Sequence, residues 1–253
     1  MCVTCGCDDP NAMAEGHTHE HTHSHATVAL RARKTNTVRL ERALLSKNQR
    51  LADQNRAWLR ARSCLAFNLM GSPGAGKTAL LEAIVRRAPE LGISVIEGDQ
   101  ATERDAERIR QAGCRAIQIN TGTGCHLDAH SVAHGLTTLA PEHGSRVVLE
   151  NVGNLVCPAL FDLGEAARIV VLSVTEGDDK PLKYPHMFRS CDALVLNKID
   201  LLPYVDFDVE RALGYARDLN PKLLAFPVSA TRGQGLEPVC AWLGSVAAAR
   251  ESA

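Results

Sequence analysis

The sequence predicts an α/β fold in which a mostly parallel central sheet is covered by helices on both faces. After residue 63, short apolar runs alternate with amphipathic stretches, and strands alternating with helices are typical of βαβ units. The chain has 253 residues, of which 45% are hydrophobic and 23% charged, so it can bury a sizeable core. This composition excludes a wholly disordered chain.

The apolar runs are too short for helices and are expected to be strands, because buried parallel strands are continuously apolar. In chain order they are Cys64–Met70, Ile93–Glu97, Ala116–Asn120, Arg146–Glu150, Arg168–Val174, Ala193–Asn197 and Leu223–Val228. The helical stretches between and after them are Thr78–Ala88, Thr102–Ala112, Leu127–Leu139, Asp206–Leu219 and Leu236–Ala249.

The region before the first strand has two compositions. Residues 1–27 hold three Cys, five His, four acidic residues and no Lys or Arg, so we expect a flexible tail. Residues 28–62 predict a basic amphipathic helix with Leu44, Leu51 and Trp58 on one stripe. Either this stripe packs on the following domain or the basic face binds an acidic partner.

Charge and hydropathy exclude some classes of protein. The formal net charge is −1, which gives no support to a nucleic-acid or membrane partner. The longest apolar run is far shorter than the ~20 residues that span a bilayer, and the first 25 residues do not resemble a signal peptide. We therefore expect a cytoplasmic protein whose nine Cys stay reduced, so metal binding is the leading explanation for some of them.

A phosphate-binding loop follows the first expected strand. Residues 71–78 read GSPGAGKT, in which Gly71, Gly74 and Gly76 let backbone N–H groups face phosphates, with Ala75 and Ala79 as flanking contacts. Lys77 is expected to reach the β- and γ-phosphates, and Thr78 to ligate Mg²⁺. The motif predicts a three-layer P-loop NTPase fold over residues 63–253.

The base recognised by this loop is expected to be guanine. The segment Asn197-Lys198-Ile199-Asp200 ends an expected strand, and a carboxylate at Asp200 can accept two hydrogen bonds from guanine but none from adenine. Ser229 and Ala230, after the last strand, are expected to close over the base. The sequence therefore favours GTP and GDP over adenine nucleotides.

Two acidic residues at strand ends are candidates for Mg²⁺ binding and, with Lys77, for catalysis. Asp99 follows the second strand and Glu150 ends the fourth, with Gly153 placed to sense the γ-phosphate. Asp99 could instead cap a helix, and Arg104 and Asp105 could be a solvated face. No arginine finger is evident, so we expect slow intrinsic hydrolysis, below about 0.1 s⁻¹.

The tail contains two groups of metal-ligating residues. Cys2, Cys5 and Cys7 offer three thiolates within six residues, which suits nickel, zinc or copper(I), the alternative being a redox or incidental role. Five alternating imidazoles are expected to buffer metal ions, unless they are simply solvated. They belong to His17, His19, His21, His23 and His25.

A third group lies inside the α/β region. Cys125 and His126 follow a Gly-rich segment, and Cys157 comes seven residues after Glu150. A metal held by these three residues would be linked to the nucleotide state, but the spacing leaves open that they are buried thiols. We interpret Cys64, Cys114, Cys191 and Cys240 as core thiols.

The motifs occur together in one order: the N-terminal Cys residues, the His-rich tail, GSPGAGKT, EGDQATERDAERI, TGTGCHLDA, ENVGNLVCP, EGDDKPLKYP and NKIDLLPY. In this combination the chain resembles the HypB family, the nickel-insertion GTPases of [NiFe]-hydrogenase maturation. The resemblance implies a P-loop GTPase that forms a GTP-favoured homodimer, with an apolar patch at Leu201, Leu202 and Val205. It implies a tight nickel site at Cys2, Cys5 and Cys7 and a weaker nickel or zinc site at Cys125, His126 and Cys157. The implied partners are a HypA-like zinc protein and the hydrogenase large-subunit precursor.

Three alternatives remain at this stage. One is a GTPase that loads another metalloenzyme, such as urease; the N-terminal cysteines speak against it. A second is a nickel or zinc store with a regulatory GTP site, which the intact nucleotide motifs disfavour. A third is a nucleic-acid or signalling GTPase that uses the basic helix, for which salt-dependent nucleic-acid binding would be the mark.

Overall fold

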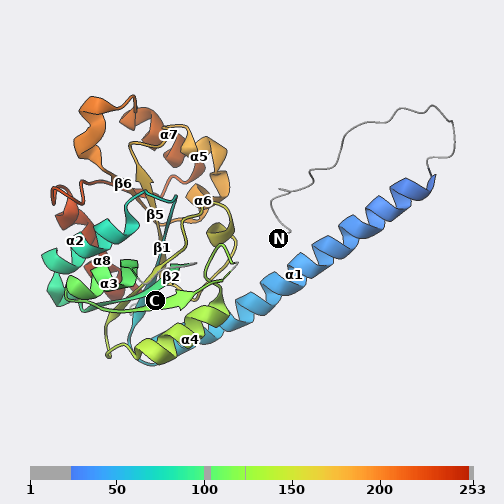
Figure 1. Cartoon of the computed structure of the whole chain (residues 1–253), viewed down its shortest axis with the longest axis horizontal. Helices are drawn as coiled ribbons and strands as arrows, with labels where there is room; N and C mark the ends of the chain where they lie inside the picture. Colours follow the sequence, from blue (N-terminus) through green and yellow to red (C-terminus); the bar gives the residue numbers. More distant parts are fainter. Residues whose placement is uncertain (1–23, 100–103, 123, 251–253) are drawn as a thin grey trace. The chain divides into compact units, whose positions relative to one another are not determined.

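The computed structural model describes residues 24–99, 104–122 and 124–250, and the chain divides into two compact units, residues 1–46 and 47–253. Helix α1 (Ser24–Arg60) runs across this division (Figure 1). It begins a few residues before the expected start at residue 28. Its last turns, from Lys47 onward, belong to the same unit as the α/β fold.

The second unit is built on a seven-stranded sheet in the order β3-β2-β4-β1-β5-β6-β7, and every pair of neighbours is parallel. All seven expected strands are present, so the parallel α/β fold is confirmed. Their bounds are β1 Leu65–Gly71, β2 Ile93–Asp99, β3 Arg115–Asn120, β4 Arg146–Glu150, β5 Ala167–Ser173, β6 Ala193–Asn197 and β7 Leu224–Pro227. The carboxyl ends of parallel strands lie at one edge of the sheet, and that edge is where ligands bind in such folds.

Helices cover both faces of the sheet because successive strand residues point to opposite sides. On one face, α2 (Lys77–Arg87), α3 (Arg104–Gln111) and α8 (Leu236–Arg250) pack on side chains such as Phe67 and Val148. On the other face, α4 (Ala129–Leu139) and the end of α1 cover β1, β2 and β4, while α6 (Pro185–Ser190) and α7 (Val209–Leu219) cover β5 and β6. The result is the three-layer arrangement that the sequence predicts.

Two short helices between β5 and β6 were not expected from the sequence. They are α5 (Lys180–Lys183) and α6, each with a proline in its first turn. Proline favours a helix start, but segments this short show no clear helical periodicity. Single turns of 3-10 helix occur at η1 (Pro89–Leu91) and η2 (Cys157–Ala159), and a longer one at η3 (Ile199–Tyr204).

The buried face of α1 adjoins the expected stripe. In the part of the helix from Lys47 onward, Leu51 and Trp58 are half-buried, and the buried positions are Asn48, Ala52, Asn55 and Leu59. This face is half polar because its amides serve as hydrogen-bond partners for loop backbone. Apolar periodicity alone therefore identifies the packed side of this helix but not its buried amides.

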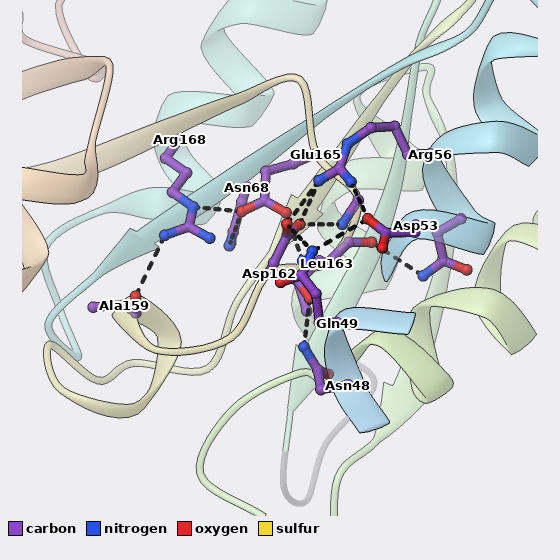
Figure 2. Close-up of polar contacts among 12 residues, drawn as sticks. Asn48, Gln49, Asp53, Arg56, Asn68, Ala159, Asp162, Leu163, Glu165 and Arg168 are labelled. Carbon is purple, nitrogen blue, oxygen red and sulfur yellow. Dashed lines mark hydrogen bonds and ion pairs between the residues drawn. The ribbon is translucent and has the colours of Figure 1, made fainter. Parts of the chain in front are cut away.

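Asn48 and Asn55 attach α1 to two loops of the α/β fold. Asn48 donates to the Asp162 carbonyl at 2.7 Å, and Asn55 donates to the Ala129 carbonyl at 2.8 Å and the Leu163 carbonyl at 3.0 Å. Arg56 adds an ion pair with Asp162, in which Nη2 lies 2.9 and 2.7 Å from the two carboxylate oxygens (Figure 2). The end of α1 is thus held by buried, directional contacts.

No helix within the described ranges 24–99, 104–122 and 124–250 is long and apolar enough to cross a membrane.

We predict that Asn55→Ala lowers the free energy of unfolding by about 2–4 kcal/mol, because it leaves two buried carbonyls without their donor. Urea unfolding of the two proteins measures the difference. Gln54→Ala, on the exposed side of the same helix turn, is the control and should change stability by less than about 0.5 kcal/mol. Equal effects of the two substitutions would contradict this account of α1.

Candidate functional site

The phosphate-loop motif lies between β1 and α2, where the sequence predicts it. Its glycines are needed for space: a Cβ at Gly71 would come 2.5 Å from the Val171 carbonyl oxygen. A Cβ at Gly76, whose φ is +93°, would come 2.5 Å from Nδ2 of Asn197. The loop is therefore packed against β5 and β6 as well as on its own helix, and its backbone is fixed before any ligand binds.

The two side chains at the start of α2 point into the fold. The Lys77 ammonium donates to the carbonyls of Gly71 at 3.4 Å and Ser72 at 3.3 Å, and burial lowers its pKa despite the attraction of Glu150. Thr78 donates through Oγ1 to Oε1 of Glu150 at 2.8 Å. The sequence-predicted phosphate and Mg²⁺ residues are thus brought together.

An acidic cluster faces these residues across a cleft of about 550 Å³. Glu97 of β2 is in register with Glu150 of β4, and Asp99 and Asp105 also line the cleft. Burial raises the pKa of Glu150 to about 7, and burial together with neighbouring carboxylates, Glu150 first, raises the pKa of Glu97 to about 8. Ionising all of these carboxylates without a counter-ion would raise the free energy of the folded state.

The acidic cluster has the chemistry of a divalent-cation site. Among the residues that the structure describes, Oε2 of Glu150 and Oε2 of Glu97 are buried without a hydrogen-bond partner. Carboxylate and hydroxyl oxygens are the ligands that Mg²⁺ prefers. A Mg²⁺ ion beside Thr78 therefore fits the residues present.

Two residues of the cleft were missed by the sequence analysis. Glu97 lies two residues before Asp99 on β2, so strand alternation puts both on one side and could have identified it. Arg108 lines the cleft from α3 and forms ion pairs with Glu82 at 3.0 Å and Asp105 at 3.1 Å. Arg108 lies one helix turn after Asp105, and no pattern in the sequence marked it as a cleft residue.

The residues expected to read the base also meet. Asn197 donates to the Ala75 carbonyl at 3.0 Å and accepts from the N–H groups of Lys198 and Ala230 at 2.8 and 3.2 Å. Ser229 donates to Asp200 at 2.5 Å. The NKxD segment and the loop after β7 thus form one hydrogen-bonded corner beside the phosphate loop. The Lys198 ammonium completes it by donating to the Gly74 carbonyl at 2.7 Å.

Cys125, His126 and Cys157 converge although the sequence could not bring them together. One ligand atom from each lies within 4.8 Å of the others. The two sulfurs are 3.2 Å apart, and Nδ1 of His126 is 3.6 Å from the Cys125 sulfur. Burial lowers the pKa of His126, which favours the neutral imidazole that binds metals, and its ring packs on Phe161 with centroids 4.1 Å apart.

The loop that carries Cys157 starts in the nucleotide cleft. It leaves β4 at Glu150 and passes the phosphate loop so closely that a Cβ at Gly153 would come 2.9 Å from Pro73. Asn154 then forms a β-bridge with Gly71. A displacement of the phosphate loop would therefore also shift the loop that carries Cys157, whose contacts with the phosphate loop lie three and four residues before Cys157.

Several expected site residues lie outside the described residues. They are Cys2, Cys5, Cys7, His17, His19, His21 and His23. His25 falls in the first turn of α1. The four other cysteines are buried or half-buried, as expected for core thiols.

Comparison with known proteins places the chain in a family. Residues 65–227 match the family described as "CobW/HypB/UreG, nucleotide-binding domain". The hydrogenase maturation factor HypB of Rhizobium leguminosarum bv. viciae is 54% identical over 216 residues, which cover 85% of this chain and 72% of that protein. The chain belongs to the HypB family. HypB of Escherichia coli K12 is 48% identical over 235 residues, covering 92% of this chain and 81% of that protein.

Solved HypB structures share the fold. HypB from Helicobacter pylori in complex with nickel has a TM-score of 0.78 and 37% identity, covering 81% of this chain and 96% of that chain. HypB from Archaeoglobus fulgidus has a TM-score of 0.75 and 41% identity, covering 80% of this chain and all of that chain. As a member of this family, the chain is a P-loop GTPase of the CobW/HypB/UreG group.

We predict that Glu97→Gln stabilises the nucleotide-free HypB chain increasingly as the pH rises. The pKa of Glu97 is raised from 4.5 to about 8, so the stability that its proton contributes is complete below pH 4.5 and is lost as the pH approaches 8. Gln mimics the protonated acid and removes this loss. Urea unfolding without divalent cations, at pH values between about 5 and 8, measures it. A constant difference between variant and wild type, or an equal trend in the exposed control Glu142→Gln, would contradict the prediction.

Proposed function

We propose that this chain is a GTP-hydrolysing nickel chaperone that couples GTP binding, hydrolysis and dimerisation to nickel delivery into the large subunit of [NiFe]-hydrogenase. The observation that carries this proposal is the position of Cys157. It lies with Cys125 and His126 in a three-ligand cluster, on a loop that starts at Glu150 in the nucleotide cleft. A change in occupancy of the cleft can therefore alter the geometry of the metal ligands.

In the proposed GTPase, the phosphate-loop glycines and Lys77 bind the β- and γ-phosphates. Thr78 and Asp99 would hold Mg²⁺, directly or through water, with Glu150 behind Thr78, and the bound ion would supply positive charge beside the phosphate oxygens. Asn197 shapes the base corner, and Asp200, held by Ser229, accepts from guanine. The burial of Lys77 and Glu150 supports these roles, because a buried charge is poorly hydrated and is stabilised when a ligand or ion of opposite charge binds beside it.

The cargo metal that we propose is nickel. A HypB structure with nickel is among the similar structures, and two sulfurs with one imidazole suit nickel or zinc. The three ligands leave room for a further donor from a second chain or from water. Cys2, Cys5 and Cys7 are proposed as a second, tighter nickel site, with the His residues of the tail as a metal buffer.

The proposed partners are a second copy of the chain, a HypA-like zinc protein and the hydrogenase large-subunit precursor. Leu201, Leu202 and Val205 lie only partly buried beside the base corner, which supports a GTP-favoured homodimer through this patch. A second recipient is also a candidate, because a 39% identical relative from Helicobacter pylori is named a hydrogenase/urease maturation factor. Urease activation is therefore the alternative to test.

The first test measures the nickel dissociation constant under reducing conditions, with GDP and with a non-hydrolysable GTP analogue plus Mg²⁺. The Cys2/Cys5/Cys7→Ser triple variant removes the proposed tighter site and keeps the cluster at Cys125. We expect this variant to keep a nickel site whose affinity differs about 5- to 150-fold between the nucleotides, the usual range for such coupling. Equal affinities would contradict the proposed coupling.

Lys77→Ala tests whether delivery needs the nucleotide. We expect loss of GTP binding and loss of nickel transfer to the hydrogenase precursor, measured by hydrogenase activity and nickel content. Lys222→Ala, an exposed lysine before β7, is the control and should behave as wild type. Nickel transfer that survives in Lys77→Ala would overturn the chaperone cycle.

Base selectivity gives an independent prediction. Asp200→Asn should lower GTP affinity at least about 10²-fold, because the amide places a donor opposite the guanine amino group. The same amide complements the carbonyl at position 2 of xanthine, so affinity for xanthosine triphosphate should rise. Titrations with both nucleotides measure this. The exposed control Asp206→Asn should leave GTP binding unchanged. If Asp200→Asn still preferred GTP, the proposed role of Asp200 in guanine recognition would be contradicted.

A further inference from the structure

Asn151 is a buried amide at the junction of three segments. It follows Glu150 at the end of β4 and is 1% exposed. Its Oδ1 accepts hydrogen bonds from the N–H of Leu127 at 2.9 Å and from its own neighbour Val152 at 3.1 Å. Its Nδ2 donates to Oδ1 of Asn68 on β1 at 3.2 Å. One side chain thus joins the loop after β4, the core of the sheet and the loop before α4.

The hydrogen bond from the Leu127 N–H to Asn151 lies directly after two of the metal-ligand candidates. Cys125 and His126 come immediately before Leu127, so Asn151 holds the backbone of the segment that supplies two of the three metal ligands. The third ligand, Cys157, is on the loop that Asn151 itself begins. Cys125 thus lies two residues before one partner of this hydrogen bond, and Cys157 lies six residues after the other.

The backbone two residues after Leu127 is held by a different element. The N–H of Ala129 donates to Asn48 at 2.9 Å, and the Ala129 carbonyl accepts from Asn55 at 2.8 Å. Both amides belong to the part of α1 that lies in the same unit as the α/β fold. In the described part of the chain, the backbone that follows His126 is thus clamped by the nucleotide-side loop at Leu127 and by α1 at Ala129.

The two clamps differ in their link to the nucleotide cleft. Asn151 lines the cleft and adjoins Glu150, which accepts from Thr78. Asn48 and Asn55 instead bond to the loop at Asp162 and Leu163, in the polar network of Figure 2. A shift of the loop after β4 would therefore move Leu127 while Ala129 stays in place.

We propose that Asn151 is a positioning residue that transmits the state of the nucleotide cleft to Cys125 and His126 through its hydrogen bond to the Leu127 N–H. The inference rests on the proposed function and names the contact by which the cleft would control the cluster. An amide suits the role, since Oδ1 can accept from two loop N–H groups, and Nδ2 makes a separate hydrogen bond to Asn68. Asn68 is itself steadied by donating to Glu165 at 3.4 Å (Figure 2).

The test compares two variants of this network in the Cys2/Cys5/Cys7→Ser background. Asn151→Ala removes the acceptor for Leu127, whereas Asn68→Ala removes the partner of Nδ2 and the donor to Glu165 but leaves the Leu127 acceptor in place, and serves as the matched control. Nickel dissociation constants are measured with saturating GDP and with saturating GTP analogue plus Mg²⁺. We expect the ratio of the two constants to fall to within about twofold of one in Asn151→Ala and to persist in Asn68→Ala, starting from a ratio of about 5 or more.

The outcomes separate the inference from the proposed function. A wild-type ratio near one overturns the proposed coupling itself. A wild-type ratio that persists in Asn151→Ala, or that is lost equally in Asn68→Ala, leaves the coupling intact and overturns the role of the Leu127 bond.

A second variant and a second readout cover the case in which Asn151→Ala does not fold. Asn151→Asp keeps the acceptor oxygen and should retain the ratio; a folded Asn151→Asp protein that has lost it would overturn the proposal. In the wild-type chain, the Leu127 amide should stay protected from hydrogen exchange with either nucleotide, because the bond has to persist to transmit movement. Rapid exchange in either state would also overturn it.

Discussion

The buried carboxylate of Glu150 accepts a hydrogen bond from Thr78 at 2.8 Å, and this contact joins the phosphate loop to the end of β4. Because β4 lies between β1 and β2, its last residue meets the phosphate loop on one side and Glu97 on the other. The loop that follows passes against Pro73 at Gly153 and brings Cys157 to Cys125. The nucleotide cleft, the acidic cluster and the metal ligands are therefore consequences of where one central strand ends.

The same edge of the sheet brings together ionisable groups that are buried away from water. Glu97 and Glu150 have raised pKa values and Lys77 a lowered one, with burial as the main cause of all three. Unsatisfied charge of this kind disfavours the folded state and favours binding of a polyanion with a divalent cation. The buried charges of the cleft lower the stability of the folded state and favour ligand binding. The buried amides of α1 instead form hydrogen bonds that attach this helix to the α/β fold.

Much of this arrangement was predictable from the sequence, and the limits have physical causes. The strands, the phosphate loop and the NKxD corner were identified because each depends on local pattern: apolar runs, glycines and fixed spacing. The convergence of Cys125, His126 and Cys157 depends on how two loops cross, which no local pattern encodes. The buried amides of α1 were not anticipated because Asn48 and Asn55 are buried by their hydrogen bonds. Glu97 could have been identified from its alternation with Asp99 on β2, but its proximity to Glu150 arises only through strand register.

The central claim is that the nucleotide cleft and the three-ligand cluster are energetically coupled, and coupling between two sites is reciprocal. The most direct measurement is the affinity of the Cys2/Cys5/Cys7→Ser chain for a GTP analogue and for GDP, each with and without saturating nickel. The account predicts that nickel changes the ratio of the two nucleotide affinities by the same factor by which nucleotide changes the nickel affinity. A ratio that is identical with and without nickel would contradict it.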